Sequence, residues 1–222
     1  MDSEEMGIGS AAIKIIVAIV LGFLILAVSS AITFLRTHTT MLLLSLILMF
    51  ILSKGNVTAY GLKITGNLRL KQTLLVGFLA GLIINILGLA LQIEEPSFLK
   101  DYTFLQAVVF IWIYASICEE VLTRGLIQGY LSPLRRYGFS IFNFRVSLPV
   151  LVAALFFGAM HLGLLTLGLD GFSVLAIVIS AFIMGIIAGY YREKTESIVP
   201  AILIHMVFNI SGSIIGFLEN LI

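Results

Sequence analysis

The chain has 222 residues, of which 60% are hydrophobic and 11% are charged, and its mean hydropathy is +1.13. Soluble domains are about 45–50% apolar and about 25% charged, so this composition excludes a soluble enzyme, a secreted disulfide scaffold and a disordered chain. A formal net charge of +1 argues against a nucleic-acid partner, and a single cysteine excludes an internal disulfide. We therefore expect an integral membrane protein that forms a single domain over residues 1–222.

Apolar segments of roughly the 20 residues needed to cross the hydrocarbon layer recur along the chain. They predict seven spans, at about 12–35, 38–53, 73–93, 105–131, 147–168, 172–191 and 198–218. A break in the last segment would make eight. The segments between the spans are too short for a soluble domain. The predicted fold is therefore an all-α polytopic membrane helix bundle, with seven or eight transmembrane helices around a polar cavity.

The basic residues between the spans predict the orientation, because cytoplasmic loops carry an excess of Lys and Arg. Nine of them share a side with the N-terminus: Lys54, Lys63, Arg69, Lys71, Arg135, Arg136, Arg145, Arg192 and Lys194. Only Arg36 and Lys100 lie on the opposite side. This asymmetry predicts a cytoplasmic N-terminus. Membrane lipids are expected partners of the basic residues.

Few ionisable residues lie inside the spans, because inserting a charged side chain at the middle of a membrane helix costs about 2.5–3.5 kcal/mol of free energy. They are Glu119, Glu120, Arg124, His161 and His205, and the amide side chain of Asn209 lies one helical turn after His205. At about 1.5 Å per residue along a helix, all of them fall between the bilayer middle and the cytoplasmic face. Their common depth predicts one shared site in the cytoplasmic half.

Helical spacing assigns these residues to faces. Glu120 and Arg124 are four residues apart and are expected to form an ion pair, whereas Glu119 points about 100° away on the same helix. The same spacing recurs on the other two spans, in Phe157 with His161 and in His205 with Asn209. Three polar stripes are therefore predicted to enclose a water-filled cavity.

In chain order these residues spell three motifs: E-E-x-x-x-R from Glu119, F-x-x-x-H ending at His161, and H-x-x-x-N from His205. Over about residues 105–215 the chain resembles the CAAX-protease and bacteriocin-processing (CPBP, Abi) family of intramembrane proteases, which includes the Ras-converting CAAX prenyl endopeptidase. The resemblance implies a cavity open to the cytoplasmic leaflet and an endopeptidase that cleaves peptides or lipid-anchored proteins. The small size of the chain resembles the prokaryotic members, which implies a prokaryotic plasma membrane.

The resemblance also implies a role for each motif residue. Glu119 is the general base that activates water, and His161 helps to hold that water or a metal. His205 and Asn209 stabilise the oxyanion or complete the coordination. The remaining motif residues support the site, with Glu120 and Arg124 as a brace and Phe157 in the cavity wall.

The chemistry of these side chains supports hydrolysis independently, because cleaving an amide needs an activated water, a proton acceptor and donors for the oxyanion. A Glu and His set also suits one divalent metal such as zinc, with Glu119, His161 and His205 as ligands. Metal-dependent and metal-free catalysis both stay open. The sequence has neither an H-E-x-x-H motif nor a G-x-S-G motif, which argues against a zincin-like or a rhomboid-like protease.

A second class of function stays open beside proteolysis. Buried Glu and His residues also form proton relays, so a proton-linked transporter is an alternative, as is a non-proteolytic membrane scaffold. The lack of an inverted repeat in the sequence weakens the transporter hypothesis.

Overall fold

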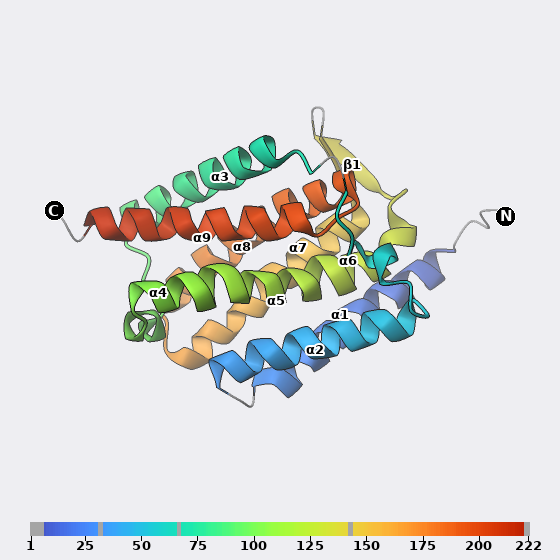
Figure 1. Cartoon of the computed structure of the whole chain (residues 1–222), viewed down its shortest axis with the longest axis horizontal. Helices are drawn as coiled ribbons and strands as arrows, with labels where there is room; N and C mark the ends of the chain where they lie inside the picture. The colour runs from blue at the N-terminus through green and yellow to red at the C-terminus, as the bar shows by residue number, and fades with distance from the viewer. Residues whose placement is uncertain (1–6, 31–32, 66–67, 142–143, 220–222) are drawn as a thin grey trace.

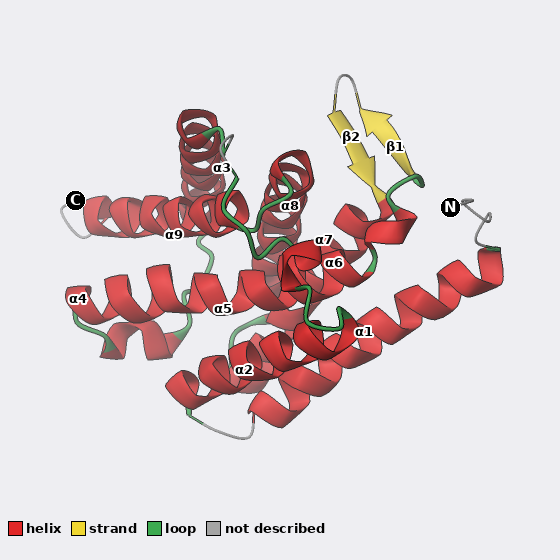
Figure 2. Ribbon diagram, turned by 45° about the vertical axis from the view of Figure 1, so that its right-hand side comes forward, coloured by secondary structure: helices red, strands yellow, loops and turns green. Residues whose placement is uncertain are grey.

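The structure is a computed structural model that describes residues 7–30, 33–65, 68–141 and 144–219. In these ranges the chain is almost entirely helical, and its helices run back and forth between two ends of one bundle (Figure 1). One end carries a short β-hairpin, and the other carries the beginning of α4 (Figures 1 and 2). We call the first the hairpin end.

The helices begin and end close to the predicted spans. The first three are α1 (Ile8–Ser30), α2 (Phe34–Leu52) and α3 (Leu70–Ala90). The fourth span is a continuous helix over Phe104–Tyr130 that contains α4 (Phe104–Gln106), α5 (Ser116–Glu120) and α6 (Gln128–Tyr130), joined by turns with wider π-type hydrogen bonding. The last three are α7 (Leu148–Met160), α8 (Gly171–Thr195) and α9 (Val199–Glu219). Short 3-10 turns occupy Val57–Tyr60, Ser97–Asp101, Ser132–Leu134 and His161–Leu167.

An all-α membrane bundle is confirmed, whereas the number of spans stays a prediction. Five helices in the described residues are long and apolar enough to cross a membrane: Ile8–Ser30, Leu70–Ala90, Phe104–Tyr130, Leu148–Leu167 and Gly171–Thr195. Two shorter apolar helices occupy Arg36–Leu52 and Val199–Ser213. Large apolar side chains are exposed on the outer faces of these helices, as expected where a bundle meets lipid.

Polar residues at the helix starts explain several of these boundaries. The Asp170 carboxylate accepts hydrogen bonds from the backbone N–H groups of Phe172 and Ser173, at 2.9 and 3.0 Å, where α8 begins. The Ser147 hydroxyl accepts the N–H of Val150 at the start of α7. Thr103 forms a capping box at the start of α4. Such caps satisfy N–H groups that have no partner within the helix.

Glycines allow the closest helix contacts in the bundle. A Cβ atom added at Gly77 would lie 2.9 Å from the Cα of Ile204, and one added at Gly81 would lie 2.8 Å from the Cα of Phe208. Gly77 and Gly81 are four residues apart on α3, so their shared face lets the backbone of α9 approach closely. This contact fixes the position of α9, which carries His205 and Asn209.

The hairpin was not predicted. Strand β1 (Gly138–Ile141) pairs antiparallel with β2 (Phe144–Ser147), within a connection expected to be a loop. Each strand has only four residues, which is too short for an alternating pattern to stand out.

Candidate active site

The buried centre of the site is an ion pair on the fourth helix. Glu120 and Arg124 are both 0% exposed, and Arg124 Nη1 donates to Glu120 Oε1 over 2.8 Å. The same carboxylate oxygen lies 3.1 Å from His205 Nδ1 on α9. Glu120 thus links the fourth helix to α9, and the spacing-based expectation of an ion pair agrees with the geometry.

The Arg124 guanidinium also packs against the aromatic ring of Phe157. Its central carbon lies 4.6 Å from the ring centroid, an arrangement that favours a cation because the ring face is electron-rich. Arg124 Nη1 also donates to Thr123 Oγ1 over 2.7 Å, and the carbonyl of Arg124 accepts a hydrogen bond from Arg192 Nε on α8. The arginine therefore ties the fourth helix to α7 and α8.

Glu119 points away from this ion pair and faces two histidines. Its Oε1 lies 3.5 Å from His38 Nε2, and its Oε2 lies 3.9 Å from His205 Nε2. The Glu119 side chain is 15% exposed, so it is mostly buried yet reachable. A carboxylate between two imidazole rings has the composition needed to hold and deprotonate a water molecule.

His38 is a site residue that sequence reasoning missed. It lies in the first turns of α2 and is 8% exposed. No spacing pattern connects it to the motifs, because it comes from a helix about 80 residues before them in the chain. The sequence offered two weak signals: His38 is the one histidine of three that lies outside the motifs, and it lies at the edge of a predicted span.

His161 lies where α7 ends and a 3-10 turn begins, whereas the sequence placed it well inside a longer helix. Its Nδ1 lies 2.8 Å from the carbonyl oxygen of Phe157. Because a carbonyl accepts hydrogen bonds, this contact assigns the proton to Nδ1 and leaves the Nε2 lone pair free for a water or a substrate proton. The Phe157 ring lies edge-on between His161 and His205, with centroid distances of 5.1 and 5.4 Å.

Asn209 completes the set from α9. Its Nδ2 donates to the buried Ser116 Oγ on the fourth helix over 3.3 Å. This bond holds the amide against the helix that carries Glu119. Ser116 was not predicted as a site residue, since a small hydroxyl in a membrane helix is common and has no distinctive pattern.

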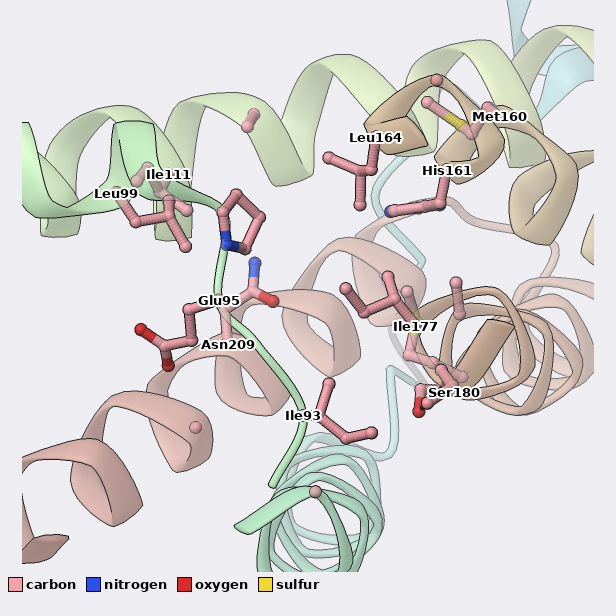
Figure 3. A pocket seen from close by; sticks show the side chains of 18 of the residues that line it. Ile93, Glu95, Leu99, Ile111, Met160, His161, Leu164, Ile177, Ser180 and Asn209 are labelled. Atoms are coloured by element: carbon pink, nitrogen blue, oxygen red, sulfur yellow. Dashed lines mark hydrogen bonds between the residues drawn. The ribbon is translucent and has the colours of Figure 1, made fainter. Parts of the chain in front are cut away.

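A single cavity of about 1560 Å³ brings these side chains together. Its lining includes all four predicted catalytic residues, Glu119, His161, His205 and Asn209, together with His38 and Phe157. Figure 3 shows His161 and Asn209 in this cavity, with Ile93 and Glu95 on an extended segment of the chain that runs past them. Glu120 and Arg124 lie behind the cavity wall, in positions that suit a brace.

The three predicted metal ligands, Glu119, His161 and His205, do not form a ready metal site. Among the residues that the structure describes, no group of three or more His, Cys, Asp or Glu side chains is placed to hold a metal ion. His205 Nδ1 lies against Glu120, and His161 Nδ1 against a backbone carbonyl. This set of metal ligands stays a prediction.

Comparison with known proteins agrees with the motifs. The family model described as type II CAAX prenyl endopeptidase Rce1-like matches residues 101–211. Neither the curated proteins nor the solved structures give a match. The matched region covers half of the chain and includes every motif residue of the cavity and its brace. The chain therefore belongs to the Rce1-like family of type II CAAX prenyl endopeptidases.

Proposed function

We propose that this protein is an intramembrane endopeptidase in which Glu119 activates a water molecule for attack on a peptide carbonyl. The family indicates a CAAX-type endopeptidase whose substrate is a peptide or prenylated protein in membranes. The observation that carries the assignment to Glu119 is its carboxylate in the cavity, within 4 Å of His38 Nε2 and His205 Nε2.

In the proposed reaction Glu119 accepts a proton from water as the water oxygen bonds to the carbonyl carbon. The carbonyl oxygen becomes an oxyanion, to which the amide of Asn209 donates a hydrogen bond. When the C–N bond breaks, the proton held by Glu119 passes to the leaving amine, which balances the step. His38 and His161 hold the water in position, and His205 is itself held by Glu120.

The reacting groups support cleavage within the half of the membrane nearer the hairpin end. At about 1.5 Å per residue, Glu119 lies roughly 16 Å from the end of its helix at Tyr130 and roughly 22 Å from its beginning at Phe104. His205 lies only about 9 Å from the start of α9. If the basic hairpin end faces the cytoplasm, this is the predicted cytoplasmic half.

The test compares the peptides in membranes and medium of cells that express the wild type or Glu119→Gln at matched levels, by mass spectrometry. Products that vanish in Glu119→Gln establish proteolysis and identify substrates. Glu196→Gln is the matched control, because it makes the same change at an exposed site near the hairpin end. Indistinguishable peptide profiles from folded proteins would instead favour the alternative of a non-proteolytic scaffold or transporter.

A further inference from the structure

We infer that a pocket between the β-hairpin and the last turns of α8 binds the phosphate group of an anionic phospholipid. This pocket shares no lining residue with the cavity that contains Glu119. The inference goes beyond the proposed function and does not depend on it, because it concerns the binding of a lipid and not hydrolysis. The charge of the pocket, its depth in the membrane and the apolar surface beside it carry the inference.

The pocket carries an excess of positive charge. Its volume is about 320 Å³, at the lower end of the range for small-molecule sites, and its lining consists of Arg135, Arg145, Ser147, Tyr190, Glu193 and Lys194. Three cations and one carboxylate give this lining a formal charge of +2. The carboxylate of Glu193 accepts a hydrogen bond from Ser147 Oγ over 2.8 Å and lies 3.3 Å from Arg135 Nε. The excess charge therefore belongs to Arg145 and Lys194.

Arg145 and Lys194 keep hydrogen-bond donors that the described part of the chain does not use. Neither forms a salt bridge with a carboxylate there. Arg145 Nη2 donates to the carbonyls of Arg136 and Arg135, over 2.7 and 3.4 Å, and Lys194 Nζ donates to Tyr190 Oη over 2.8 Å. These bonds hold both groups in place, yet a guanidinium has five N–H donors and an ammonium has three. The remaining donors match the acceptor oxygens of a phosphate group.

The pocket lies where two membrane helices end. Lys194 is in the last turn of α8, and Ser147 caps the start of α7, and both helices belong to segments long and apolar enough to cross a membrane. The ends of such helices lie at the level of the lipid headgroups, where tyrosines such as Tyr190 are also enriched. This depth is the same whichever way the protein is oriented in the membrane.

The hairpin presents an apolar surface beside the pocket. Arg145 and Ser147 are two residues apart on β2, so they share one face of the hairpin. Phe139 and Ile141 lie on the other face of β1, and both are exposed. The hairpin extends from the end of the bundle (Figure 2), so these side chains are placed to contact acyl chains below the headgroups. A free phosphate ion has no apolar part to match this surface, which favours a phospholipid as the ligand.

Lipid binding to the purified protein tests the inference without any knowledge of the substrate. The protein is delipidated in dodecyl maltoside and titrated with phosphatidylglycerol or phosphatidylcholine, and native mass spectrometry measures the lipid-bound fraction. The pocket variant combines Arg145→Gln with Lys194→Gln. The control variant combines Arg136→Gln with Lys71→Gln, which removes the same charges from exposed positions outside the pocket. Competition with inorganic phosphate distinguishes a lipid headgroup from a free ion.

We expect the wild type and the control variant to prefer phosphatidylglycerol over phosphatidylcholine. The pocket variant should bind phosphatidylglycerol about 30-fold more weakly, because each basic side chain near an anionic lipid surface contributes a factor of about five. Inorganic phosphate at the same concentration should not displace the lipid.

Equal affinity for the two lipids, or equal losses in the pocket and control variants, would overturn the inference. Displacement by inorganic phosphate would also overturn it, because the pocket would then take a free ion. Lys194→Gln alone removes no hydrogen bond to the backbone and should weaken binding about fivefold. An unchanged affinity for that single variant would overturn the inference even if the double variant does not fold.

Discussion

The strongest test of the site's architecture is removal of the Arg124 side chain. Arg124→Ala leaves the carboxylate of Glu120 buried at 0% exposure, without its ion-pair partner at 2.8 Å. Breaking a buried ion pair by removing one partner costs about 3–5 kcal/mol, because the remaining charge has lost both water and its counter-ion. The alanine also removes the contact with the ring of Phe157.

This free-energy loss predicts a clear change in thermal stability. For chains of this length, 1 kcal/mol corresponds to a shift in Tm of about 2–4 °C, so we expect Arg124→Ala to lower Tm by about 6 °C or more. Folded yield and proteolytic activity should fall together. The measurement is thermal unfolding of the detergent-purified protein, followed by intrinsic fluorescence, with size-exclusion chromatography to quantify the folded fraction.

Two variants make the reasoning refutable. The double variant Glu120→Gln with Arg124→Ala removes both charges and should recover part of the lost Tm, because no unpaired charge stays buried. Arg136→Ala, at an exposed arginine near the hairpin, should change Tm little. A Tm for Arg124→Ala within about 2 °C of the wild type, or a double variant as unstable as the single one, would refute the brace.

Three further predictions concern other parts of the molecule. His38→Gln, which removes the ring beside the proposed catalytic carboxylate of Glu119, should lower kcat by up to about 100-fold with little change in KM or Tm, measured on a substrate found in the peptide comparison. Gly81→Ala should cost about 1–3 kcal/mol of unfolding free energy, because the new methyl group overlaps the backbone of α9, whereas Gly9→Ala, with no atom within 4 Å, should not. A hydrogen bond from Lys63 lowers the pKa of Glu196, so their pair stabilises the fold above the ordinary glutamate pKa of 4.5. That contribution should disappear as the pH falls through the lowered pKa, and Glu196→Gln should abolish this pH dependence, which is at most about 0.5 kcal/mol at so exposed a pair.

Each of these predictions has an outcome that contradicts it. An unchanged kcat for His38→Gln would mean that the imidazole does not position the reacting water. Equal stability of Gly81→Ala and Gly9→Ala would mean that α3 and α9 can separate at little cost. For Glu196→Gln, the same loss of Tm on acidification as the wild type would show that the ion pair with Lys63 contributes nothing.

That residues of the fourth helix, α7 and α9 line one cavity could be predicted, because each helix carries its own pattern. Ionisable residues are rare in membrane helices, so Glu119, His161 and His205 stood out, and their common depth indicated one site. His38 and Ser116 could not be found in this way, because their roles depend on which helices pack together. The 3-10 turn that follows α7 at His161 could not be predicted either, since it continues the apolar sequence without any change in composition.

The side from which the cavity opens was also beyond the sequence. Depth along a helix follows from counting residues, and it places Glu119 near the middle of its helix whichever end is open. The opening depends instead on where side chains fill the space between helices. Residues 120–129 are all buried, whereas Gln92, Glu95 and Asp101 line the cavity and are exposed.

The buried residues 120–129, between Glu119 and the hairpin end, have a consequence for the cell that contains this protein. Where water enters the cavity as far as Glu119, only the part of the protein between Glu119 and the hairpin end still separates the two sides of the membrane. Along the fourth helix this part is roughly 16 Å thick. The buried side chains of residues 120–129 must therefore keep protons and ions from crossing the remaining distance. The Glu120–Arg124 pair lies in this barrier as well as beside the proposed catalytic groups. Loosening it would disturb catalysis and would also open a leak that dissipates the membrane potential.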